Sequence, residues 1–89
     1  MQKSLKSAEY GRLIELLVAA RHEADIPQQA LARKLGRPQS FIAKYEGGER
    51  RIDVIEFIAI AQAIGADPLK LFKEFLAETP AKSARKRAR

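Results

Sequence analysis

The fold is decided by residues 28–48, which read Gln28-Gln29-Ala30-Leu31-Ala32-Arg33-Lys34-Leu35-Gly36-Arg37-Pro38-Gln39-Ser40-Phe41-Ile42-Ala43-Lys44-Tyr45-Glu46-Gly47-Gly48. This stretch predicts a short helix that ends at Gly36, and a second helix from about Gln39 to Glu46 that stops at Gly48. Glycine adopts the left-handed conformation at a helix end without steric cost. The order of helix, glycine turn and helix indicates a helix-turn-helix.

Three further helices are predicted around this pair, over about 8–24, 54–64 and from Pro68 to before Thr79. The first is expected to bury the apolar residues that recur at helical spacing, which are Leu13, Leu16, Leu17, Ala20 and Ala24. Asp53 is a good N-cap for the helix over 54–64. That helix is apolar on most of its circumference, so we expect it at the centre of the core. The fold class is therefore all-α with five helices.

Charge and composition point to a polyanion as the partner. The chain has 89 residues, a hydrophobic fraction of 46% and a net charge of +6. Residues 79–89 hold five basic residues and no acid, and residues 33–51 hold six basic residues against two acids. These segments carry +5 and +4, which leaves −3 on the rest. Positive charge thus concentrates on the predicted helix-turn-helix and on the end of the chain.

This distribution divides the chain into a flexible arm over 1–8, a helical domain over 9–78 and a disordered basic tail over 79–89. The chain has no cysteine, which excludes disulfides and thiolate metal sites. No apolar run follows the lysines near the N-terminus as in a signal peptide. The apolar stretch 54–64 is shorter than the roughly 20 residues needed to span a bilayer. We expect no membrane association.

Residues 10–77 resemble the Xre-type helix-turn-helix regulators, which are related to phage Cro and lambda repressor. The positions that carry the resemblance are Arg21, Gln28, Leu31, Ala32, Leu35, Gly36, Ile42, Glu46, Gly48 and Arg50-Arg51. The resemblance implies a compact five-helix domain that binds operator DNA, usually as a symmetric dimer. Pro27 and Pro38 stand where the family often has a Ser or Thr cap, and Arg37 replaces a commonly apolar residue.

Three residues of the second short helix are the candidate base contacts. The amide of Gln39 offers a donor and an acceptor that match the N6 and N7 edge of adenine. The resemblance implies base reading by Gln39 and Ser40, and a further contact in the groove by Lys44. The alternatives are a solvated surface for Gln39 and Lys44, and a Ser40 hydroxyl that bonds its own backbone.

Four residues are candidate contacts to the DNA backbone. Arg37, Arg50 and Arg51 are interpreted as phosphate contacts, which fix register without carrying sequence information; the alternative is an ordinary charged loop. By resemblance, Gln28 touches a phosphate and supports Gln39.

The resemblance also implies an internal ion pair between Arg21 and Glu46, with a free surface position for Arg21 as the alternative. Phe75 and Leu76 are the candidate dimer interface, although the same residues could instead close the chain's own core. His22 stands without a ligand cluster and Ser40 has no identifiable base, so we expect no catalytic residue, metal or cofactor.

The leading hypothesis is a small transcriptional repressor that binds a palindromic operator on double-stranded DNA as a homodimer. It would be cytoplasmic, encoded by a bacterium or phage, and associated with the nucleoid. An antitoxin-like protein that binds an unlike protein partner is one alternative. Nonspecific nucleic-acid binding through the basic tail is another.

Overall fold

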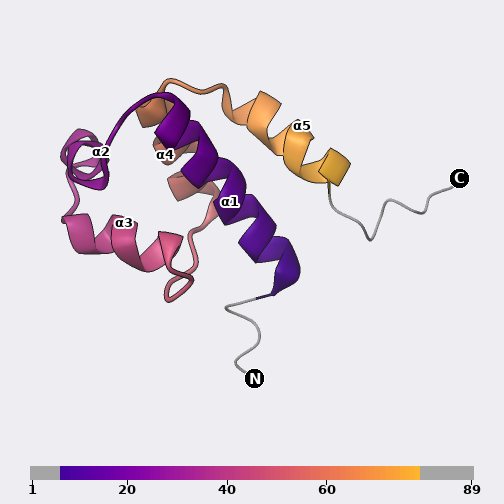
Figure 1. Cartoon of the computed structure of the whole chain (residues 1–89), viewed down its shortest axis with the longest axis horizontal. Helices are drawn as coiled ribbons and strands as arrows, with labels where there is room; N and C mark the ends of the chain where they lie inside the picture. Colours follow the sequence, from indigo (N-terminus) through magenta and orange to yellow (C-terminus); the bar gives the residue numbers. More distant parts are fainter. Residues whose placement is uncertain (1–6, 79–89) are drawn as a thin grey trace, which may run out of the picture.

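The computed structural model describes residues 7–78, and all regular structure in this range is helical (Figure 1). The elements are α1 (Ala8–Glu23), α2 (Gln28–Leu35), α3 (Gln39–Glu46), α4 (Val54–Ile64) and α5 (Pro68–Glu78). The prediction of an all-α, five-helix domain is confirmed. The predicted basic tail and residues 1–6 of the predicted arm lie outside the described residues.

Helix α1 begins within the segment predicted as an arm. Ala8 is its first residue, and Ser7 is its N-cap, whose side chain accepts a hydrogen bond of 3.1 Å from the backbone N–H of Tyr10. A serine hydroxyl satisfies a backbone donor that the first helical turn leaves free. The first helix therefore begins at the last residue of the predicted arm, one residue before the predicted start of the helical domain at residue 9.

Helix α1 lies between the other elements. It packs against α3, α4 and α5, while α2 packs against α3 and α4. Figure 1 shows α2 and α3 on one side of α1 and α5 on the other. The pair α2–α3 is thus held against a support made by α1 and α4.

The turns obey the chemistry of glycine and proline. Gly36 and Gly48 have positive φ angles of 67° and 82°, the left-handed conformation that the sequence predicted. Pro27 and Pro38 are the N-caps of α2 and α3 and form no side-chain cap hydrogen bond. Their fixed φ partly compensates by presetting the backbone that enters each helix.

The core is built from the inward faces of all five helices. Leu31, Ile42 and Tyr45 are fully buried. The face predicted for α1 was wrong in part, because its buried residues are Tyr10, Ile14, Leu17 and Arg21. Apolar residues of α1 lie on most sides of the helix, so their spacing did not determine which side is buried.

Helix α4 was expected at the centre of the core, and it packs against α1, α2 and α5, but its two halves differ in burial. Its second half is in the core, with Ile60 and Ala61 almost inaccessible. In its first half, Val54 and Ile55 are 70% and 72% exposed. An apolar sequence pattern shows how much apolar surface a helix has, but not which part of that surface the neighbouring helices cover.

A buried ion pair joins α1 to the end of α3. Arg21 Nε and Nη2 donate to the two carboxylate oxygens of Glu46 at 2.8 and 3.0 Å, and both side chains are only 8% exposed. Arg21 Nη1 also donates to the backbone oxygen of Ile26 at 2.9 Å, at the entry to α2. The guanidinium thus links three segments of chain.

Arg21→Met should lower the free energy of unfolding by about 3 kcal/mol, because it leaves the Glu46 carboxylate buried without a counter-charge. Urea denaturation measures the effect. The double variant Arg21→Met/Glu46→Leu should regain much of that loss, since it removes the stranded charge. A loss below about 1 kcal/mol for Arg21→Met would show that the pair behaves like an exposed one.

Candidate nucleic-acid interface

Helix α3 divides into a buried and an exposed side. Phe41, Ile42 and Tyr45 point into the core. Gln39, Ser40 and Lys44 are all exposed, and Ser40 and Lys44 are four residues apart, so they share one face. Because the buried side is fully packed, the polar side is presented on a fixed support.

A chain of hydrogen bonds runs from the buried ion pair to the start of α3. Gln28 Nε2 donates to Glu46 Oε1 at 2.8 Å, and Gln39 Nε2 donates to Gln28 Oε1 at 3.3 Å. The carboxylate of Glu46 can only accept, so it determines which end of the Gln28 amide faces it. The Gln28 oxygen then faces Gln39. We call this series, from Arg21 through Glu46 and Gln28 to Gln39, the Arg21–Gln39 chain.

A second cluster flanks α3 and gathers four elements around one aromatic ring. The guanidinium carbons of Arg37 and Arg50 lie 4.1 and 4.8 Å from the centre of the Phe41 ring. Both arginines also bond Glu56 of α4, at 3.1 Å in each case. We call Arg37, Phe41, Arg50 and Glu56 the Glu56 cluster. It joins the α2–α3 turn, α3 and the α3–α4 loop to α4.

Glu56 remains ionised throughout the neutral range. Its hydrogen bond with Arg50 lowers the pKa of the carboxyl to about 2, helped by the backbone N–H of Asp53 and by Arg37, while burial acts the other way. The same hydrogen bond raises the pKa of Arg50. Glu56 is also the third residue of α4, where it completes a capping box with Asp53.

Arg51 lies beside Tyr10 of α1 rather than in the Glu56 cluster. Its guanidinium carbon is 4.6 Å from the centre of the Tyr10 ring, and the residue is exposed. The Tyr10 hydroxyl donates to the backbone oxygen of Arg50 at 3.0 Å and accepts from Ile52 N at 3.2 Å. Burial raises the pKa of this hydroxyl, so it stays neutral. Its two hydrogen bonds hold the α3–α4 loop against α1.

The sequence interpretation missed Glu56, Phe41 and Tyr10 as residues that position the candidate contacts. One local signal was available, because Asp53 followed by Glu56 has the spacing of a capping box. The contacts of Glu56 with Arg37 and of Tyr10 with the Arg50 loop join positions far apart in sequence. No local pattern encodes them.

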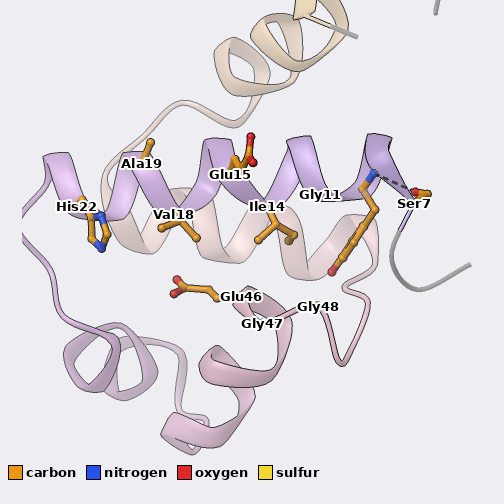
Figure 2. A pocket seen from close by; sticks show the side chains of 11 residues that line it. Ser7, Gly11, Ile14, Glu15, Val18, Ala19, His22, Glu46, Gly47 and Gly48 are labelled. Atoms are coloured by element: carbon orange, nitrogen blue, oxygen red, sulfur yellow. Dashed lines mark hydrogen bonds between the residues drawn. The ribbon is translucent and has the colours of Figure 1, made fainter. Parts of the chain in front are cut away.

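An open groove of about 530 Å³ lies between α1 and the end of α3 (Figure 2). Ile14 and Val18 line its wall on α1, and Gly47 lies opposite them. Glu46 at its edge is already engaged with Arg21 and Gln28. Within residues 7–78, no group of three or more His, Cys, Asp or Glu side chains could hold a metal ion. No helix in that range is long and apolar enough to cross a membrane.

The predicted dimer residues lie on α5 beside other apolar side chains. Leu76 is 55% exposed, and Phe75 is half-buried with its ring centre 5.8 Å from that of Phe72. Phe72 and Leu69 are also exposed, and they line a groove of about 490 Å³ between α4 and α5. We call Leu69, Phe72, Phe75 and Leu76 the α5 apolar surface.

Comparison with known proteins identifies this arrangement. A helix-turn-helix family model matches residues 17–71. A solved structure described as an XRE-family like protein from Pseudomonas syringae pv. tomato is 48% identical and superposes with a TM-score of 0.80. The match covers 89% of this chain and 96% of the other. No curated protein matches. The chain therefore belongs to the Xre-type helix-turn-helix family, whose members bind DNA and are not enzymes.

Proposed function

We propose that this protein is a transcriptional regulator that recognises a specific DNA sequence by inserting α3 into the major groove. The observation that carries this proposal is the exposure of Gln39, Ser40 and Lys44 on a helix whose other side is buried. The recognition helix of a helix-turn-helix lies in the major groove, where exposed side chains of its N-terminal part contact base edges. The Arg21–Gln39 chain of hydrogen bonds also fixes the orientation of the Gln39 side chain.

In this proposal, Gln39, Ser40 and Lys44 contact bases. Gln39 donates to Gln28 through its Nε2, which has a second hydrogen, and its Oε1 is an acceptor. That leaves a donor and an acceptor for the adenine edge. Gln28 contacts a phosphate while it orients Gln39.

The cationic residues beside α3 supply the attraction to the DNA backbone. Arg37 stands on one flank, in the Glu56 cluster, and Arg51 stands beside Tyr10. Contacts of this kind are independent of sequence and weaken as salt rises, because counterions are released from the DNA. They bring α3 to the groove, where its exposed side chains distinguish one site from another.

We further propose that the protein acts as a homodimer through the α5 apolar surface. Leu69, Phe72 and Leu76 are 62%, 44% and 55% exposed on one short helix. A contiguous exposed apolar surface of this kind marks an interaction site. Two copies related by a two-fold axis would place two α3 helices about 34 Å apart and read a palindromic operator. Repression would follow from occupying that operator.

The same apolar surface supports a second candidate, in which it binds an unlike protein, as in an antitoxin. Size and composition of the purified assembly separate the two. A homodimer that binds its operator alone supports the repressor. A stable complex with a different chain in one-to-one proportion supports the partner-binding protein.

Gln39→Ala should weaken binding to the preferred duplex by about 1–3 kcal/mol and relax selectivity at one base position, because the bidentate contact is lost. The preferred duplex is first selected from a random pool with the wild-type protein, and affinities are then measured by fluorescence anisotropy. Gln29→Ala is the matched control, since Gln29 is also exposed but lies on α2. It should leave both affinity and selectivity unchanged.

Two results would contradict this assignment. If the wild-type protein enriches no sequence from the pool, the regulator proposal is wrong. If Gln39→Ala weakens binding to random and preferred duplexes equally, Gln39 reads no base.

Leu76→Asp should convert the dimer to monomers and lower affinity for the palindromic site at least about tenfold, because the second half-site then binds independently. Light scattering gives the mass, and a palindrome compared with a single half-site gives the affinity change. Ala77→Asp is the control, since Ala77 is exposed next to Leu76 but outside the α5 apolar surface. A Leu76→Asp dimer with full affinity would place the interface elsewhere.

A further inference from the structure

Arg37 and Arg50 look equivalent in the sequence, but they make different contacts in the Glu56 cluster. Arg37 and Arg50 are almost equally exposed, at 40% and 41% of their side chains. Both guanidiniums lie near Phe41 and both reach Glu56. They differ in how many of their donors the protein already uses.

Most N–H groups of the Arg50 guanidinium already donate hydrogen bonds within the protein. Its Nη1 donates to the backbone oxygen of Arg51 at 3.0 Å and to Glu56 Oε1 at 3.1 Å, and its Nη2 donates to Glu56 Oε2 at 3.1 Å. Three of the five N–H groups of a guanidinium are thereby engaged. A two-pronged pair with a carboxylate fixes the plane of the guanidinium as well as its position.

Arg37 commits a single N–H to the cluster. Its Nη2 donates to Glu56 Oε2 at 3.1 Å, and its remaining N–H groups are open to an anion. Arg37 lies two residues before Gln39, so a phosphate bound there would lie beside the first turn of α3. The Phe41 ring, 4.1 Å from its guanidinium carbon, limits the positions that the group can take.

Glu56 itself cannot move easily. It is 15% exposed, accepts a 2.9 Å hydrogen bond from Asp53 N, and its own N–H donates to Asp53 Oδ1 at 2.7 Å. Releasing the carboxylate from the arginines toward solvent would also open this capping box. A phosphate therefore adds to the cluster rather than replacing Glu56.

We propose that Glu56 is a positioning residue for DNA binding, which fixes Arg50 as a support and holds Arg37 ready for a phosphate next to Gln39. The proposal rests on the proposed function and extends it. The change in DNA affinity that it predicts for loss of the Glu56 charge is opposite in sign to the change expected from simple electrostatics. An acidic residue near DNA repels the phosphates, so charge alone predicts tighter binding when it is removed.

Glu56→Gln tests this, because glutamine also completes a capping box and keeps the size of the side chain, while the substitution removes the charge and one of the two acceptor oxygens. The ratio of affinities for the selected duplex and for a random duplex of equal length should fall about fivefold or more. Glu49→Gln is the matched control, since Glu49 is an exposed acid of the α3–α4 loop, next to Arg50, and makes none of these contacts. It should strengthen binding to both duplexes similarly and leave their ratio unchanged.

The salt dependence of binding gives a second, independent measurement. Arg37→Gln should reduce the slope of log affinity against log salt by about one unit, as expected for one lost phosphate contact. Arg50→Gln should lower the affinity ratio as Glu56→Gln does, but leave the slope nearly unchanged. Both arginines are well exposed, so this comparison remains informative if Glu56→Gln fails to fold.

The outcomes separate this proposal from the one on which it rests. A wild-type protein that prefers no duplex overturns both. A selective wild type with Glu56→Gln indistinguishable from Glu49→Gln overturns the role of Glu56 alone. Equal loss of slope in Arg37→Gln and Arg50→Gln overturns the division between the arginines.

Discussion

The buried pair of Arg21 and Glu46 is the constraint on which the rest of the interface depends. Two charges that are 8% exposed must satisfy each other and their remaining hydrogen bonds, because water cannot do so. Arg21 meets this requirement with Glu46 and the Ile26 carbonyl, and Glu46 meets it with Arg21 and Gln28. The geometry is therefore narrow. It sets the angle between α1 and the end of α3 and, through Gln28, the orientation of the amide that faces Gln39.

The Glu56 cluster does for one flank of α3 what the ion pair does for its C-terminal end. A helix of eight residues is too short to be stable alone in water, so its form depends on contacts along its length. Glu46 ties its last residue to α1, and Phe41 ties its first turn to α4 through the two arginines. The two acids differ in setting, since Glu56 keeps contact with solvent. Together they leave α3 little freedom to tilt.

The sequence predicted those features that have local physical causes. Gly36 and Gly48 marked helix ends because only a residue without a side chain takes positive φ freely, and prolines marked the starts of α2 and α3. The α1 face was wrong in part because apolar residues lie on several sides of the helix, and because Tyr10 and Arg21 are buried through bonds to partners far along the chain, Arg50 and Glu46. Hydrophobic periodicity gives such residues no weight. The exposure of Val54 and Ile55 was missed because it depends on which parts of α4 the other helices cover. The resemblance supplied the Arg21–Glu46 pairing, but nothing in the sequence indicated that Arg37 and Arg50 share Glu56.

These pairings also change what the local charge means. The segment 33–51 has six basic residues and two acids, a net +4 by count. In space, Arg21 joins it to neutralise Glu46, and Glu56 joins it to bind Arg37 and Arg50. The added charges cancel, so the total that attracts a polyanion stays at +4. The attraction to a polyanion can therefore be predicted from composition. Glu46 and Glu56 contribute instead by fixing the positions of their partners. Glu56 holds Arg37 and Arg50 beside α3, and Glu46 orients the Gln28 amide that faces Gln39. Fixed positions of this kind are what discrimination between DNA sequences requires and what net charge cannot supply.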